Sequence, residues 1–267
     1  MPNVLVTIPH HARHVPEQVL AAMAFEGGAD RWLDRLHDEA DPYTDEIFDV
    51  PDATVVKATV SRFVVDLNRD RNDDGPNGVV KRTDFRGRPL YSPGQEPDAA
   101  EVEARLRKFY DPFESAVDAA LDHADFFVDG HSMQPVGPAL GPDAGKRRPP
   151  ISVVIGGGIY DGAGHTSLPY EIARDVARLA AECFGVDRVT VNEPFDYGDI
   201  QRRLSDPARP NHRPGFLLEI NRALYLRRNS RDVDVPIPGA TETLRDAFTA
   251  LLERVAPLMA EAREVHA

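Results

Sequence analysis

The chain has 267 residues, of which 42% are hydrophobic, and it carries a formal net charge of −13 at pH 7. This length is enough to bury a sizeable core, and the composition excludes a globally disordered chain. The acidic balance argues against broad binding to nucleic acid or to an anionic membrane surface, because both depend on clustered Lys and Arg. A small anionic substrate stays compatible, since a few arginines in one cleft can dominate the local field.

Cysteine use and the N-terminal segment indicate where the protein works. The single cysteine, Cys183, cannot form an internal disulfide and lies in a helical pattern that predicts core packing. The N-terminal segment lacks the basic start and long apolar run of a signal peptide. No stretch approaches the roughly 18 apolar residues of a membrane span. We therefore expect a cytoplasmic protein without a membrane segment, and the sequence indicates no particular oligomeric state.

Short apolar runs alternate with segments of helical apolar spacing along the chain. Such alternation favours an α/β fold, and the absence of repeats and linkers favours one domain over residues 1–267. Residues 69–94 lack apolar periodicity and predict a long functional loop, and Gly156-Gly157-Gly158 predicts a loop over a cleft. The expected strands are 4–8, extended structure within 54–67, 125–128, 151–155, 189–191 and 215–220, and the expected helices are 16–25, 30–48 with a break at Asp41-Pro42, 101–124, 168–184 and 240–264.

Four polar clusters follow predicted strands, where α/β sheets commonly place their ligands. Their chemistry is complementary: imidazoles and a carboxylate suit a metal, arginines suit an anion, and a further carboxylate suits proton transfer. The clusters are Pro9-His10-His11, Asp66-Leu67-Asn68-Arg69, Asp129-Gly130-His131-Ser132 and Glu219-Ile220-Asn221-Arg222.

Seven segments that span most of the chain resemble the N-formylglutamate amidohydrolase family. They are IPHHARHVP, ADPYTDEIF, VSRFVVDLNRD, TDFRGRPLY, FFVDGHSMQP, VNEPFDYGD and LLEINRALYL. The DLNR element is also similar to that of aspartoacylases, whose fold is similar to that of zinc carboxypeptidases. This wider resemblance implies a three-layer αβα, zinc-exopeptidase-like α/β fold with a central mixed, largely parallel sheet. It also implies one catalytic Zn²⁺ ion, or another divalent metal in its place.

The family motifs imply that His10 and His131 bind the metal. Zinc hydrolases typically use three protein ligands and leave one position for water. Arg13 stands where a carboxypeptidase-like His-x-x-Glu would place its glutamate, so Asp41 of the DPYTDEIF segment is the preferred third ligand. The alternative ligands are His11, Asp45 and Glu46. Asp41 is also suited to cap the helix that follows it.

The resemblance also implies the residues for catalysis and for substrate binding. Glu219 is the expected general base and acid, with a structural ion pair as the alternative. Guanidinium groups bind carboxylates through two parallel hydrogen bonds, so arginines are expected to clamp the substrate. The expected substrate-binding residues are Arg62, Asn68, Arg69, Arg222 and Tyr225. The alternative is a scaffold role, with Arg69 paired to Asp66 or Asp70, and Asp66 itself is expected to be structural or to orient a ligand.

The implied reaction is hydrolysis of N-formyl-L-glutamate, or of a similar small anionic N-acyl amino acid, to a carboxylate and the free amino acid. The segments PHHA and EPFDYGD depart from the family pattern, so a different N-acyl amino acid or a small peptide stays open as the substrate. A carboxypeptidase-like peptide hydrolase and a non-catalytic binding protein on the same fold are the alternative functions.

Overall fold

The computed structural model describes residues 3–23, 28–139, 141, 143–157 and 165–265. Its central feature is a six-stranded sheet in the order β2-β1-β3-β6-β4-β5. The strands are β1 (Val4–Ile8), β2 (Ala53–Lys57), β3 (Phe126–Met133), β4 (Ile151–Val154), β5 (Val189–Val191) and β6 (Gly215–Asn221). β2, β1, β3 and β6 are parallel, whereas β4 runs antiparallel to β6 and parallel to β5. The predicted mixed, largely parallel sheet is confirmed.

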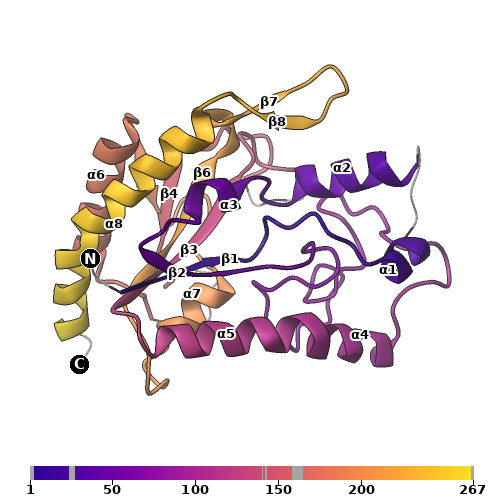
Figure 1. Cartoon of the computed structure of the whole chain (residues 1–267), viewed down its shortest axis with the longest axis horizontal. Coiled ribbons are helices and arrows are strands. Elements are labelled where there is room, and N and C mark those ends of the chain that lie inside the picture. The colour runs from indigo at the N-terminus through magenta and orange to yellow at the C-terminus, as the bar shows by residue number, and fades with distance from the viewer. Residues whose placement is uncertain (1–2, 24–27, 140, 142, 158–164, 266–267) are drawn as a thin grey trace.

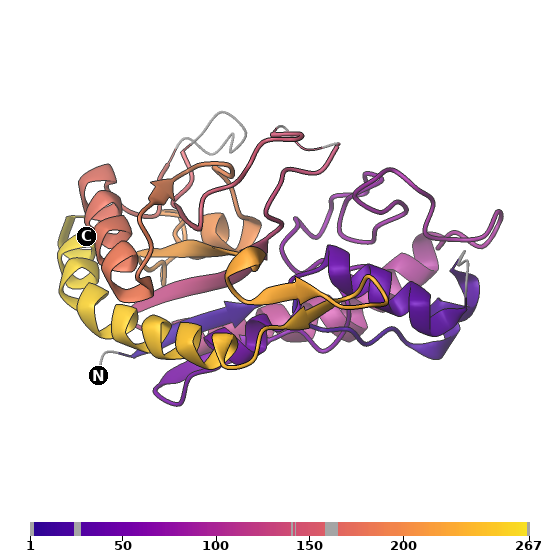
Figure 2. The ribbon, with the colours of Figure 1, turned by 90° about the horizontal axis from the view of Figure 1, so that it is seen from above.

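Helices cover both faces of this sheet, which gives three layers (Figures 1 and 2). One core lies between the sheet and α3, α6 and α8, and the other lies on the side of α1, α2, α5 and α7. The helical elements are α1 (Glu17–Ala22), α2 (Ala29–Glu39), α3 (Thr44–Phe48), α4 (Ala99–Arg105), the π-helical turn η1 (Leu106–Tyr110), α5 (Asp111–Leu121), α6 (Tyr170–Phe184), α7 (Asp199–Leu204), the 3₁₀ turn η2 (Arg222–Leu224) and α8 (Ala240–Val265). The three-layer α/β prediction is therefore confirmed.

The central strands read as continuous apolar runs because both of their faces are covered. In β1, Val4, Val6 and Ile8 contribute to one core, whereas Leu5 contributes to the other. Successive side chains of a strand point to opposite faces, so every residue of β1 is buried.

Two strands are longer than the sequence predicts. β3 continues through the polar residues that were expected to lie beyond its end, so His131 lies inside the strand. β6 extends the expected strand 215–220 by one residue, to Asn221. The parallel ladder that pairs these strands runs on to the pair Met133 and Asn221. Backbone hydrogen bonding therefore extends the sheet into the polar cluster despite the change in side-chain character.

The predicted extended segment 54–67 is wrong beyond Lys57, where β2 ends. The chain then leaves the sheet. The amide of Ser61 donates to the carbonyl of the distant His14, and the amide of Val64 donates to the carbonyl of Ser61 in a local turn. No helix or strand is assigned between β2 and α4 within this described segment, which includes the predicted long loop. The sequence did not indicate α7 or the two-stranded hairpin of β7 (Leu226–Arg228) and β8 (Asp234–Pro236).

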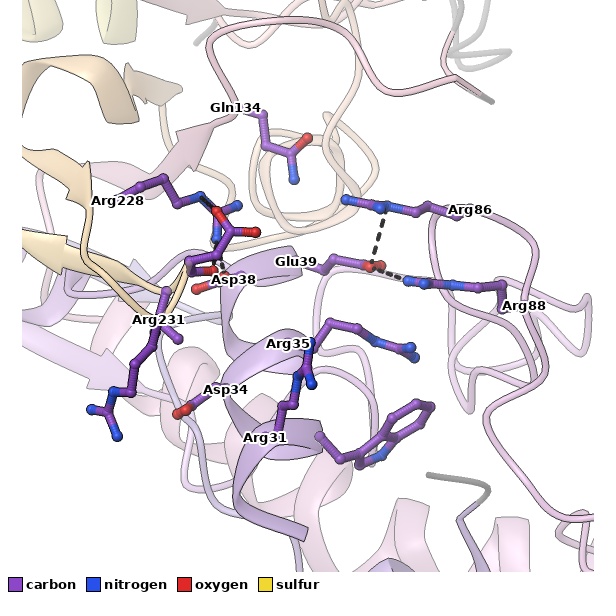
Figure 3. Close-up of a pocket in the computed structure, with 13 residues that line it drawn as sticks. Arg31, Asp34, Arg35, Asp38, Glu39, Arg86, Arg88, Gln134, Arg228 and Arg231 are labelled. Carbon is purple, nitrogen blue, oxygen red and sulfur yellow. Dashed lines mark hydrogen bonds and ion pairs between the residues drawn. The ribbon is translucent and has the colours of Figure 1, made fainter. Parts of the chain in front are cut away.

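A cavity of about 530 Å³ opens between α2, the loop that carries Arg86 and Arg88, and the β7–β8 hairpin (Figure 3). Across the described ranges, no helix combines the length and apolar character that a membrane crossing requires. Parts of the predicted helix 16–25 and of the predicted glycine loop at 156–158 lie outside the described residues.

Gly130 is required by the close approach of β3 to α3. A Cβ atom at this position would lie 2.6 Å from Cδ2 of Phe48, whose ring packs edge-on against Phe248 of α8. Because the surrounding core is close-packed, we expect Gly130→Ala to lower the free energy of unfolding by about 1–3 kcal/mol. Urea denaturation followed by circular dichroism measures this change. Gly75→Ala is a suitable control, since the nearest atom to a Cβ at this position would be a side-chain oxygen of Asp73, at 3.1 Å. Equal losses of unfolding free energy in the two variants would contradict the packing argument.

Candidate metal centre

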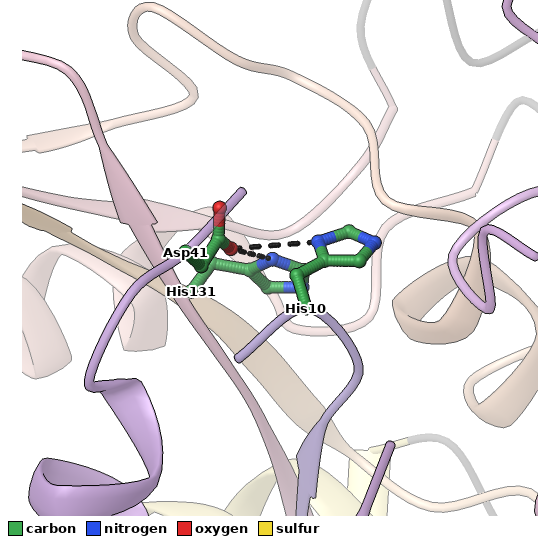
Figure 4. Close-up of side chains that lie close together, drawn as sticks. All are labelled: His10, Asp41 and His131. Atoms are coloured by element: carbon green, nitrogen blue, oxygen red, sulfur yellow. Dashed lines mark hydrogen bonds and ion pairs between the residues drawn. The ribbon is translucent and has the colours of Figure 1, made fainter. Parts of the chain in front are cut away.

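Three polar side chains from separate elements meet at the carboxyl edge of the parallel strands. His10 lies two residues beyond β1, Asp41 lies between α2 and α3, and His131 lies in β3. The Oδ2 atom of Asp41 is 3.0 Å from Nδ1 of His131 and 3.4 Å from Nδ1 of His10 (Figure 4). One ligand atom from each residue lies within 4.8 Å of the others, and all three residues are buried. This arrangement surrounds a space that is suited to a cation.

The backbone around Asp41 explains how its carboxylate reaches the histidines. The amide of Asp41 donates to the carbonyl of His10 at 3.2 Å, which ties the α2–α3 link to the end of β1. α3 has Tyr43 at its N-cap position and receives no side-chain capping bond. The Asp41 carboxylate instead accepts from the amide of Ser132 at 3.3 Å. The alternative that Asp41 caps the following helix is therefore wrong.

Each histidine is oriented by a second buried carboxylate. Nε2 of His10 lies 2.7 Å from Oδ1 of Asp66, and Nε2 of His131 lies 3.0 Å from Oδ2 of Asp129. The other oxygen of Asp129 accepts a hydrogen bond from Thr7 at 2.6 Å. Such carboxylate–histidine pairs fix the ring and leave the opposite nitrogen available for a metal.

The donor set fits a divalent metal. Nδ1 of His10 is buried and has no hydrogen-bond partner among the described residues, although it points toward Asp41. An unpaired buried nitrogen is unfavourable unless it has another partner. Two imidazole nitrogens and a carboxylate oxygen are ligands that Zn²⁺ accepts in hydrolases. Asp45, Glu46 and His11 lie outside this group, and Nδ1 of His11 instead faces the carbonyl of Ile8 at 3.3 Å.

The electrostatics of the centre reflect its buried carboxylates. Burial opposes the charge on Asp41, but His10 and His131 together hold the pKa of that carboxyl well below its usual range. Burial likewise opposes the imidazolium of His131, yet Asp129 and Asp41 raise the pKa of His131 well above 6.5. Without a metal, protonation of the His131 imidazole therefore balances part of the negative charge of Asp41 and Asp129.

Glu219 lies directly beside His131, because the two residues are paired in the β3–β6 ladder. Its side chain is buried, and Oε2 has no hydrogen-bond partner among the described residues. Burial and the charge of Asp41 raise the pKa of Glu219 to about 7, although His131, Arg148 and Arg222 act in the opposite direction. A carboxyl with this pKa can exchange a proton near neutral pH.

The residues expected to clamp the substrate lie around the same centre. Arg62 is buried, pairs with Asp66 at 2.8 Å and lies 3.7 Å from Oδ1 of Asp41. Nδ2 of Asn68 lies 3.3 Å from Nε2 of His131. Arg69 is half-buried and donates to the carbonyl of Asn68 at 2.9 Å. Among the described residues, neither Asp66 nor Asp70 lies within ion-pair distance of Arg69, so the structure does not form the alternative pairs.

Arg222 and Tyr225 hold the segment that carries Asp41. Nη1 of Arg222 donates to the carbonyl of Asp38 at 2.6 Å, and Nη2 lies 3.4 Å from Oδ1 of Asp41. The hydroxyl of Tyr225 donates to the carbonyl of Pro42 at 2.9 Å. These contacts position the carboxylate, and contact of either side chain with a substrate stays a prediction.

Sequence reasoning assigned no role to three residues of the site. Asp129 precedes His131 by two positions on one strand, and the alternation of strand faces was a signal that the two share a face. Lys81 is fully buried and pairs with Asp66 at 2.8 Å, but no pattern around it distinguishes it from a surface lysine. Arg148 pairs with Asp143 at 2.7 Å and its guanidinium lies 4.8 Å from the ring centre of Phe195.

Comparisons with known proteins show the family of the chain. The N-formylglutamate amidohydrolase family profile matches residues 3–226. The chain is 27% identical to an N-formylglutamate deformylase of Pseudomonas putida over 84% of this chain and 81% of the relative. It is also 27% identical to an N-formylglutamate deformylase of Pseudomonas aeruginosa PAO1, over 99% and 95% of the two chains.

A solved structure shares the fold. The crystal structure of an N-formylglutamate amidohydrolase from Ralstonia eutropha JMP134 superposes with a TM-score of 0.74 at 20% identity, over 99% of this chain and 95% of that chain. The match of the family profile over most of the chain shows that the protein belongs to the N-formylglutamate amidohydrolase family.

Proposed function

We propose that the protein is a metal-dependent amidohydrolase that cleaves N-formyl-L-glutamate, or a similar N-acyl amino acid, to a carboxylate and the free amino acid. The observation that carries the proposal is the convergence of His10, Asp41 and His131, with Glu219 beside His131 on the adjacent strand. The names of the Pseudomonas relatives support N-formylglutamate as the substrate.

His10, Asp41 and His131 would hold the metal through the two Nδ1 atoms and a carboxylate oxygen. A divalent metal bound there supplies Lewis-acid polarisation of the scissile carbonyl and makes water more acidic. Asp66 and Asp129 keep the imidazole rings in place, and Arg222 keeps the Asp41 segment in place. The protein therefore presents its ligands in a fixed arrangement.

Glu219 is the proton carrier in this proposal. Its ionised carboxylate takes a proton from the attacking water and returns that proton to the departing amine nitrogen. The absence of a hydrogen-bond partner for Oε2 among the described residues supports this role, because a carboxylate engaged in a structural ion pair would be less available. The pKa of about 7 suits both halves of the transfer.

Arg69 is the best-placed residue to bind a substrate carboxylate. Its Nε and Nη1 atoms donate to backbone carbonyls, whereas no partner for Nη2 is found among the described residues. Arg62 lies deeper, between Asp66 and Asp41, where it balances the charge of the two carboxylates. Arg69 follows Asn68, whose Nδ2 atom lies 3.3 Å from Nε2 of His131, so an anion bound by Arg69 would lie beside the residues of the proposed metal centre.

The proposal is tested by a screen of N-formyl and N-acyl amino acids with Zn²⁺-loaded protein. We expect N-formyl-L-glutamate to be hydrolysed with the highest kcat/KM, because Arg69 is proposed to bind a substrate carboxylate. We expect the activity to be lost on chelation, because the cluster of His10, Asp41 and His131 is proposed to hold the metal. Release of formate and free amine measures the reaction, and peptides with a free C-terminus serve as the comparison. Metal-loaded protein that hydrolyses none of the acyl amino acids would refute the proposal.

Metal affinity should rise with pH. The pKa of His131 is raised well above 6.5 in the metal-free site, so its proton is bound at neutral pH and the metal must displace it. We expect Zn²⁺ affinity to increase by roughly tenfold per pH unit for each proton displaced, as competition titrations between pH 6 and pH 8 would measure. His131→Ala should abolish binding, whereas the exposed His14 makes His14→Ala a matched control. An affinity that does not change with pH would contradict proton displacement.

Replacement of Glu219 separates chemistry from metal binding. We expect Glu219→Gln to retain the metal and to lower kcat by roughly 10²–10⁴-fold, because the amide cannot accept the proton of water. Steady-state kinetics and metal analysis of the same sample provide both readouts. Turnover within a few-fold of the parent protein would remove Glu219 from the mechanism.

A further inference from the structure

The cavity shown in Figure 3 lies outside the group of residues that forms the metal centre. None of His10, Asp41, His131 and Glu219 lines it. Its volume of about 530 Å³ falls within the range of small-molecule sites. α2 supplies one wall, Arg86 and Arg88 lie on one side, and Arg228 and Arg231 lie on the other (Figure 3).

The lining of this cavity is positive although the whole chain is acidic. Six arginines and four carboxylates contribute to it, whereas the chain as a whole has a net charge of −13. Three of the carboxylates are already engaged: Asp34 with Arg13, Asp38 with Arg228, and Glu39 with Arg88. The fourth, Asp232, is almost fully exposed and lies 3.8 Å from Arg228. The carboxylates therefore do not neutralise the remaining arginines.

Three arginines of the cavity, Arg31, Arg35 and Arg231, have at most one ion pair each among the described residues. Among the described residues, Arg31 and Arg231 form no ion pair, and Arg35 approaches only Asp84, at 3.4 Å. Asp84 already accepts from Nε of Arg88 at 2.7 Å, so the charge of this carboxylate is shared between Arg88 and Arg35. These three guanidinium groups have donors to offer to a ligand.

Arg35 is held in place as a binding group. Its guanidinium carbon lies 3.8 Å from the ring centre of Trp32, which restricts the long side chain by stacking. Its Nε atom is buried without a hydrogen-bond partner among the described residues. Burial and the neighbouring Arg88 lower the pKa of Arg35, so its charge is poorly compensated. An anion would supply both the missing acceptor and the missing charge.

We infer that this cavity binds a small, multiply charged oxyanion, either a dicarboxylate or a phosphate, through Arg31 and Arg35, which lie together on α2 (Figure 3). Guanidinium groups bind both classes of anion through paired hydrogen bonds. A lining with more arginines than carboxylates favours a ligand with at least two negative charges over a singly charged one. The inference concerns a site beside α2 and does not depend on the proposed hydrolysis.

The single tryptophan of the chain gives a direct measurement, because Trp32 lines this cavity. The probes are succinate and inorganic phosphate, each titrated into metal-loaded protein while Trp32 fluorescence is recorded and calorimetry is run in parallel. We expect saturable binding that weakens as NaCl is added. Tighter binding of succinate would assign the site to carboxylates, and tighter binding of phosphate would assign it to phosphate groups.

Variants locate the binding. We expect Arg35→Gln and Arg31→Gln each to weaken binding by roughly tenfold or more, because each removes charge-assisted hydrogen bonds. Arg31 is exposed and forms no ion pair among the described residues, so its variant keeps the test valid if Arg35→Gln is unstable. Arg188→Gln removes an exposed arginine that pairs with Glu193 outside the cavity, and it should leave the affinity unchanged.

Three results would overturn the inference. These are the absence of saturable binding for both probes, unchanged affinity in the Arg35 and Arg31 variants, and loss of binding when the metal is removed. The last result would assign the signal to the metal centre. Because binding is measured without turnover, failure of this inference and failure of the proposed hydrolysis are distinguishable.

Discussion

Burial of two imidazoles and a carboxylate at one point is the constraint around which the polar interior is arranged. Removing such groups from water is costly unless each gains a partner. Asp66 and Asp129 therefore face the outer nitrogens of His10 and His131, and Arg62 and Lys81 balance the charge of Asp66. A bound cation would provide the remaining partner for the Nδ1 atoms of His10 and His131 and for the carboxylate of Asp41.

The parallel part of the sheet turns this requirement into fixed positions. Thr7 and Asp129 are paired across β1 and β3, and His131 and Glu219 are paired across β3 and β6. The register of adjacent strands therefore fixes the supporting residues Thr7 and Asp129 relative to the proposed reacting residues His131 and Glu219. Cores on both faces of the sheet hold the strands, so the site rests on rigid elements.

Arginine has three distinct tasks in this acidic protein. Arg222 binds backbone carbonyls and so fixes the position of Asp41, whereas Arg62 neutralises buried carboxylates. The arginines of the α2 cavity are different, since Arg31 and Arg231 form no ion pair within the part of the chain that the structure describes. Net charge describes the solubility of the whole chain, and only local geometry shows where positive charge gathers.

The sequence by itself determined the α/β class, most of the strands and helices, and the two candidate histidine ligands His10 and His131, with Asp41 as the preferred third ligand among several. Apolar periodicity and local motifs carry that information, because they depend on residues close together in the chain. Only the tertiary structure decided that Asp41, rather than Asp45 or Glu46, faces the histidines, since the choice depends on Arg222 and on a backbone bond to His10. The burial of Lys81, the end of β2 at Lys57 and the arginine cavity were likewise undetermined, because they arise from contacts between segments that are distant in the sequence.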